Sequence, residues 1–178
     1  MRKLISIILI TFLISGCAIV HNYDAYYGKI IDAETKEPLE GAAVLAVYCT
    51  QQYGPAGSVS HYLDAKETLT DKNGEFKIPS FTFLTFRVLQ SFERDVWFTI
   101  FKPGYGCYPN NKGIKPASLR NGILPPGNYV TIELPKLMSK EERIENQRCE
   151  PTSIPYENYA KFRQLVNIER EKLGLPLE

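Results

Sequence analysis

The sequence predicts a mainly β domain followed by a helical tail. From about residue 26 to residue 136, apolar and polar residues alternate with a period of two, and Gly, Pro, Asn and Asp residues separate the alternating runs. After Pro135 the apolar spacing changes to that of amphipathic helices. The full length of 178 residues is enough for one core of ordinary size.

One predicted strand, residues 42–49, is apolar on both of its alternating faces. A strand of this kind is typically buried on both sides, so a second layer must cover its outer face. Two stretches rich in Gly, Pro and polar residues, 50–64 and 102–128, are expected to be long surface loops. The predicted strands are residues 26–32, 42–49, 65–70, 75–78, 81–89, 96–101 and 129–134.

The tail, residues 137–178, is expected to contain two helices that pack on the sheets. Ser139 followed three residues later by Glu142 is the pattern of a capping box, which predicts the start of the first helix. The second is predicted over about 155–174 and has one broad apolar face that needs a partner. The outer face of strand 42–49 is the candidate partner, and another part of the sheets or another protein is the alternative.

Three segments carry a resemblance to a known family: residues 28–32 (GKIID), 35–44 (TKEPLEGAAV) and 70–79 (TDKNGEFKIP). Their order and approximate spacing are similar to those of carboxypeptidase regulatory-like domains, and residues 101–105 (FKPGY) match the segment where that family often ends its sixth strand. The resemblance covers about residues 26–136 and implies a transthyretin-like, or prealbumin-like, seven-stranded β-sandwich.

The resemblance implies a fold and no activity. The family accompanies catalytic, transport and surface proteins without doing chemistry itself, so the function has to come from particular sites. One departure from its pattern is Lys36, where the family commonly has Gly. Because a Cβ atom strains a left-handed turn, this turn is expected to differ from that of the family.

The N-terminal residues have the organisation of an export signal. Arg2 and Lys3 precede an apolar run over 4–14, which ends in Ile14-Ser15-Gly16-Cys17. This pattern resembles the lipobox of bacterial lipoprotein signal peptides. The resemblance implies cleavage after a signal peptide of residues 1–16 and a diacylglyceryl thioether on Cys17. The alternative is an ordinary secretory signal, or an uncleaved anchor, in which Cys17 is unmodified.

Lipidation of Cys17 would make the chain a cell-envelope protein held to the membrane by its N-terminal lipid. Residues 17–25 are then expected to be a tether. In a cell with two membranes, lipoproteins kept in the inner membrane usually carry Asp after the lipidated cysteine. Ala18 therefore favours the outer membrane, facing the periplasm.

The charge balance argues against nucleic acid as a partner. Removal of residues 1–16 takes away Arg2 and Lys3, which changes the net charge from +1 to about −1. Binding to phosphates requires a basic face that releases counterions, and a chain of this charge does not predict one. The expected partners are the membrane and, as a possibility left open, another envelope protein.

Three cysteines remain after Cys17, in a compartment where disulfides persist. At most one internal pair can form, and the sequence alone leaves all three pairings open, as well as three thiols. We favour Cys107 with Cys149, because both lie beside turn-rich or helix-end segments. Cys49 ends an apolar strand, where a thiol acts as a small buried hydrophobe.

The sequence does not predict an enzyme, a metal site or a cofactor. The chain has two histidines, His21 and His61, and neither is close in sequence to Cys49, Cys107 or Cys149. His61, Asp64 and Glu67 are potential metal ligands, but a spacing of three places them on alternating faces of a strand. A second acidic segment, Asp71-Lys72-Asn73-Gly74-Glu75, is expected to be a hairpin turn rather than a calcium loop.

Four tyrosines are candidate ligand-binding residues, because exposed aromatic side chains on loops bind sugars or peptides: Tyr53, Tyr62, Tyr105 and Tyr108. The alternative is that they pack their own loops. The only tryptophan, Trp97, is expected in the core. The leading hypothesis is a non-enzymatic, lipid-anchored structural or protein-interaction module. The alternative is a carbohydrate- or peptide-binding module that uses the tyrosine-bearing loops.

Overall fold

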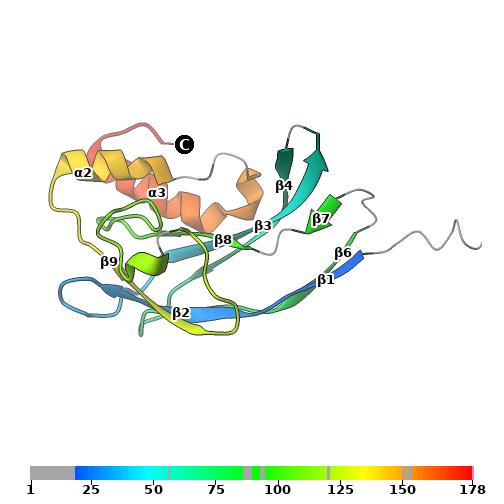
Figure 1. Ribbon diagram of the computed structural model, residues 1–178. Helices are drawn as coiled ribbons and strands as arrows, with labels where there is room; N and C mark the ends of the chain where they lie inside the picture. The colour runs from blue at the N-terminus through cyan, green and yellow to red at the C-terminus, as the bar shows by residue number, and fades with distance from the viewer. Residues whose placement is uncertain are drawn as a thin grey trace, which may run out of the picture.

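The computed structural model describes residues 19–55, 57–85, 90–92, 95–119, 121–149, 151 and 154–177. The β-strands form two layers that face each other, and the C-terminal helices cover the outer face of one of them, which gives three layers in all (Figure 1). The prediction of a mainly β chain with a C-terminal helix is confirmed. The predicted signal peptide and Cys17 lie outside the described residues.

The first layer, called the first sheet below, consists of a three-stranded sheet and a two-stranded antiparallel ladder that follows on from it. Its strands are β1 (Ile19–Tyr23), β2 (Tyr26–Asp32), β5 (Glu75–Ile78), β6 (Phe81–Thr85) and β9 (Tyr129–Leu134). β2 pairs antiparallel with β5 and parallel with β9, and β1 pairs antiparallel with β6. The β1–β6 pairing continues the β2–β5 register without a slip, since Tyr23 lies opposite Phe81 and Tyr26 opposite Ile78.

This ladder corrects one expectation from the sequence. Residues 19–23 were expected to belong to a tether over 17–25, but they form a strand of the fold. The ring of Tyr23 is buried against those of Tyr48 and Phe81, with centroids 4.6 and 5.3 Å apart. The folded domain therefore begins at residue 19 or earlier.

The second sheet is built on β3 (Ala43–Gly54). β3 pairs with β4 (Gly57–Leu69) along one edge, and with β7 (Gln90–Phe92) and β8 (Trp97–Phe101) along the other. The expectation of a surface loop over 50–64 is thus wrong, because β3 and β4 stay paired as a hairpin from Thr50 and His61 to Gly54 and Gly57. Most side chains in this outer part of the hairpin are exposed. Main-chain hydrogen bonds between the strands, rather than burial of apolar side chains, therefore hold it together.

The other predicted loop, residues 102–128, contains no extended strand in its described part and only one short helical turn, η1 (Ala117–Leu119). It is nevertheless packed into the protein, because Tyr108, Ile114 and Leu124 are at most 1% exposed. The prediction of a long surface loop therefore holds for the lack of extended strands, but not for these three side chains, which are buried.

The alternating side chains of β3 contribute to two separate cores. Val44, Ala46 and Tyr48 face the first sheet. Ala43 and Leu45 face the helical tail. The residues that complete the inter-sheet core include Ile30, Phe76, Ile78, Phe98, Ile100, Ile132 and Leu134, and those of the core under the tail include Ala65, Phe101, Tyr159, Phe162 and Val166.

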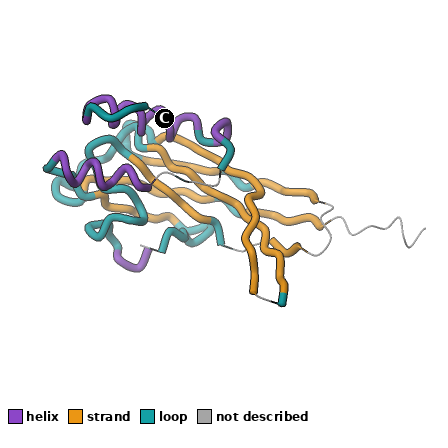
Figure 2. The backbone as a smooth tube through the Cα atoms, turned by 90° about the horizontal axis from the view of Figure 1, so that it is seen from above, coloured by secondary structure: helices purple, strands orange, loops and turns teal. Residues whose placement is uncertain are grey.

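The tail contains α2 (Lys140–Glu145), η2 (Asn146–Cys149), η3 (Tyr156–Asn158) and α3 (Ala160–Leu173). Seen from above, the helices lie along one side of the strands (Figure 2). The capping box is present, since Glu142 N donates to Ser139 Oγ at 3.1 Å and Ser139 N donates to Glu142 Oε2 at 3.1 Å. No helix in the part of the chain that the structure describes has both the length and the apolar character needed to cross a bilayer.

The turn at Lys36 keeps a left-handed conformation although the residue has a Cβ atom. Its φ is 62°, within the left-handed region that favours glycine. A left-handed conformation costs a non-glycine residue roughly 1–2 kcal/mol. Lys36 Nζ donates to Ala33 O at 2.8 Å and to Glu133 Oε2 at 2.6 Å, and these contacts hold the lysine across the turn.

The N-terminus of α3 is capped by a strand of the sheet. Tyr159, at the N-cap position, makes no capping bond with its side chain. Glu67 of β4 replaces it: its two carboxylate oxygens accept the N–H groups of Lys161 at 2.9 Å and Phe162 at 3.0 Å. A carboxylate is favourable at this end of a helix because the N-terminal N–H groups lack partners within the helix.

We predict that Glu67→Ala lowers the free energy of unfolding by about 1 kcal/mol, the usual cost of losing a helix cap. Chemical denaturation of the full chain in a Cys17→Ser background measures this. The matched control is Glu171→Ala, which removes an exposed carboxylate from α3 itself and should change stability by less than about 0.5 kcal/mol. Equal losses in the two variants would contradict the capping role.

Candidate functional site

The main candidate site in the described part of the chain is an open cleft beside α2. It has a volume of about 440 Å³ and lies between α2 with η2 on one side and two loops, 110–112 and 135–137, on the other. Most of its lining residues are amides or charged side chains, with charges of both signs. The residues are Asn110, Asn111, Lys112, Pro135, Lys136, Leu137, Glu142, Glu145, Asn146 and Cys149.

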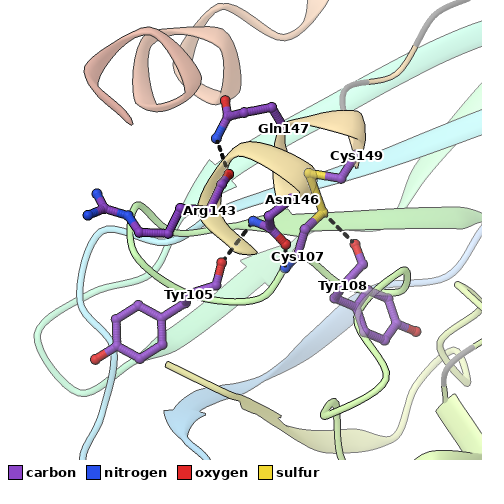
Figure 3. Close-up of a disulfide and its surroundings, with 7 residues drawn as sticks. All are labelled: Tyr105, Cys107, Tyr108, Arg143, Asn146, Gln147 and Cys149. Atoms are coloured by element: carbon purple, nitrogen blue, oxygen red, sulfur yellow. Dashed lines mark hydrogen bonds between the residues drawn. A yellow bond between two sulfur atoms is a disulfide. The ribbon is translucent and has the colours of Figure 1, made fainter. Parts of the chain in front are cut away.

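A disulfide between Cys107 and Cys149 joins the two sides of this region, with Cα atoms 6.2 Å apart (Figure 3). This is the pair that the sequence analysis favoured among the three possibilities. Asn146 adds two hydrogen bonds beside it: its Oδ1 accepts the N–H of Cys107 at 2.7 Å, and its Nδ2 donates to Tyr105 O at 2.9 Å. The disulfide and these two hydrogen bonds therefore hold η2 against the loop that contains Cys107.

A buried ion pair fixes α2 against α3. Arg143 Nε and Nη2 donate to the two carboxylate oxygens of Glu169 at 2.6 and 2.7 Å, and the N–H of Gly104 donates to the same carboxylate at 3.2 Å. The Glu169 side chain is 2% exposed, so removal of the Arg143 charge would leave this carboxylate buried without its counterion. These hydrogen bonds raise the pKa of Arg143 above its usual value and keep the helical wall of the cleft in place.

The chemical groups of the cleft suit hydrogen bonding to a polar ligand. The Glu142 carboxylate is occupied by the N–H groups of Met138 and Ser139, at 3.0 and 3.1 Å. Glu145 and the two lysines, Lys112 and Lys136, offer charges of both signs around the side-chain amides. The described lining has no histidine, and its cysteine is in the disulfide, so it presents no activated nucleophile of the Cys–His type.

The four candidate tyrosines do not form one exposed aromatic surface. Only Tyr53 is largely exposed, at 68%, near the tip of the β3–β4 hairpin. The hydroxyl of Tyr62, which is half-buried against the helical tail, accepts a hydrogen bond from Asn158 Nδ2. Tyr108 is fully buried and donates to Leu119 O at 2.5 Å. The candidate binding surface shared by these tyrosines is therefore not formed, because the hydroxyls of Tyr62 and Tyr108 are bonded within the protein.

Tyr105 is also engaged internally, with the buried carboxylate of Asp32. Burial alone would raise the pKa of Asp32, but hydrogen bonds from the N–H groups of Thr35 and Glu34 and from the Tyr105 hydroxyl, with the nearby charge of Lys136, hold it below its usual value. The same carboxylate and burial raise the pKa of Tyr105. This tyrosine therefore supports the turn after β2.

The acidic segments considered as metal ligands have structural roles. Glu67 caps α3, whereas Asp64 pairs with Lys66 at 2.8 Å. Asp71 Oδ1 accepts the N–H groups of Asn73 and Glu75 at 2.8 and 2.9 Å, which is the expected hairpin turn. Among the described residues, no group of three or more His, Cys, Asp or Glu side chains is arranged to hold a metal ion.

Two further features differ from the sequence analysis. Trp97 is 43% exposed at the start of β8, so its expected place in the core is wrong. The cleft was not predicted, because it brings residues 110–112 against residues 135–149, which follow them by at least 23 positions in the sequence. The signal for it was the Cys107–Cys149 pairing, which places the first tail helix against the loop that follows β8.

The chain matches no family model, and it has no significant similarity to a curated protein or to a solved structure.

We predict that a Cys107→Ser/Cys149→Ser variant loses about 4 kcal/mol of stability, because the bond closes a loop with a sequence separation of 42. Chemical denaturation of the full chain in a Cys17→Ser background measures this. Cys49→Ser, which removes the thiol outside the disulfide, is the control and should cost less than about 1 kcal/mol. A double variant as stable as the parent would contradict the proposed role of the bond in holding the tail.

Proposed function

We propose that this chain is a non-enzymatic, lipid-anchored protein of the bacterial cell envelope whose folded domain is a structural or protein-interaction module. The observation that carries the proposal is Ile14-Ser15-Gly16-Cys17, placed after Arg2, Lys3 and an apolar run. A single acyl chain gives marginal binding to a membrane, whereas the two or three of a bacterial lipoprotein give a stable anchor. In a cell with two membranes, the proposed location is the outer membrane, facing the periplasm.

The structure of the mature part is consistent with such a module in two respects. The polar cleft beside α2 offers amide and charged groups for recognition. Its walls are fixed by the Cys107–Cys149 bond and by the Arg143–Glu169 pair, so a partner would meet a preformed surface. The partner we propose is another protein of the envelope.

We further propose that the two sheets have the transthyretin-like topology of carboxypeptidase regulatory-like domains, as a seven-stranded sandwich. Three of the segments that carry the resemblance support this. GKIID lies within β2, and EFKI forms β5 directly after the turn that begins at Asp71. The turn at Lys36 has the left-handed conformation for which glycine is usual.

A second candidate function is a carbohydrate- or peptide-binding module. The tyrosines give it little support, because Tyr108 is buried and Tyr62 and Tyr105 are bonded internally. The cleft favours it instead, since its asparagine amides and charged groups match the donors and acceptors of polar ligands. The cleft would then contain the binding site, in place of the tyrosine-bearing loops.

Mass spectrometry of the chain expressed in a bacterium that processes lipoproteins tests the anchor. We expect the N-terminal peptide to begin at Cys17 with the mass of a diacylglyceryl group, and the protein to sediment with membranes. Cys17→Ser should remove the diacylglyceryl mass and the cleavage before residue 17, while Cys49→Ser, the matched control, should keep the lipid mass, the cleavage and the sedimentation. A wild-type N-terminus without lipid, on a protein that stays soluble, would contradict the proposal.

A further inference from the structure

The start of β1 is tied closely to the proposed lipid-bearing residue. Ile19 is only two residues after Cys17, and two residues of extended chain span at most about 7 Å. Acyl chains on Cys17 would therefore hold this end of the domain next to the lipid headgroups. A flexible tether of several residues would not impose this constraint, and the structure leaves no room for one.

The side chains on the outer face of this end are apolar. Val20 and Leu84 lie directly opposite each other in the β1–β6 register and are 58% and 55% exposed. Directly opposed side chains on adjacent strands are close enough to form one surface. The next pair on the same face is Asn22 with Thr82, whose side chains are hydrogen-bonded to each other at 2.8 Å. Polarity on this face therefore increases with distance from the start of β1.

The two strands also lack charged groups of the usual surface type. β1 reads IVHNY and β6 reads FTFLT, so neither contains Asp, Glu, Lys or Arg. The imidazole of His21 in β1 is half-buried on the inner face, and burial lowers its pKa, which favours the neutral form. Soluble proteins commonly carry charged side chains on exposed edge strands, because the unpaired N–H and C=O groups of such strands otherwise pair with other chains and cause aggregation. A lipid surface would remove the need for that protection.

The arrangement of the domain separates this end from the cleft. Figures 1 and 2 place the start of β1 and the end of β6 at one end of the molecule and α2 at the opposite end. Since α2 forms one wall of the cleft, the cleft lies at the end of the molecule opposite the start of β1.

We infer that the end of the β1–β6 ladder rests in the interface of the bilayer, with Val20 and Leu84 against lipid, and that the cleft faces away from the membrane. The occupant of this apolar surface is thus the lipid bilayer itself. The inference rests on the proposed lipidation of Cys17. The short distance from Cys17 to β1 is what selects lipid over a protein partner, because it places the surface at the membrane.

Quenching of tryptophan fluorescence by lipids with brominated acyl chains tests this orientation. The full-length lipoprotein, with Trp97→Phe to remove the native signal, is reconstituted into phosphatidylcholine–phosphatidylglycerol vesicles. Leu84→Trp and, separately, Val20→Trp report on the β1–β6 end. Met138→Trp is the matched control, because Met138 is 84% exposed and directly precedes the capping residue of α2.

We expect brominated lipid to reduce the emission of Leu84→Trp and Val20→Trp at least about two-fold, as for side chains buried 5–10 Å into the interface. The emission of Met138→Trp should be almost unchanged. Equal quenching at the two ends, or quenching of Met138→Trp alone, on protein whose N-terminal peptide carries the lipid mass, would overturn this inference and leave the anchor intact. A peptide without the lipid mass would overturn the proposed function, and this inference with it.

Discussion

The burial of β3 on both faces is the constraint on which the rest of the structure depends. One face of the strand closes the core between the sheets, and the other is apolar as well, with Ala43 and Leu45 fully buried. The helical tail provides the cover, since Phe162 and Val166 of α3 pack on that face. Each large side chain buried in this way contributes about 1.5–3 kcal/mol. Because the tail completes a core, it belongs to the domain, and the disulfide, the Arg143–Glu169 pair and the Glu67 cap all act at its contacts.

The parts of the fold that the sequence predicted well are those where side-chain patterning is strong. Residues 26–32, 75–78 and 129–134 alternate cleanly between turns and become β2, β5 and β9 with the same bounds. The outer half of the β3–β4 hairpin was missed because it is held by main-chain pairing and its side chains are polar on both faces. The burial and hydrogen bonding of the tyrosines could not be predicted for a different reason. Whether a tyrosine is exposed depends on a partner for its hydroxyl, such as Leu119 O for Tyr108, and only the tertiary structure reveals that partner.

The two ends of the domain differ in chemistry in a way that fits the proposed location. At the end where β1 begins, the described strands β1 and β6 contain no Asp, Glu, Lys or Arg and expose Val20 and Leu84, and the sequence puts the proposed lipid site two residues before β1. The other end has the cleft, with its amides and charges. The disulfide beside the cleft is suited to an exported protein, because such bonds persist in oxidising compartments. A rigid body of this kind would present its polar end to other molecules of the envelope.

Hydrogen exchange measured by mass spectrometry on the whole chain tests most directly whether the tail is part of the domain. The account predicts that the amides of α3, around Phe162 and Val166, exchange through the same cooperative opening as those of β3 around Leu45, with the same free energy. If α3 exchanged with an opening free energy several kcal/mol lower while β3 stayed protected, the tail would unfold separately from the β-strands. That result would contradict the dependence of β3 on its helical cover.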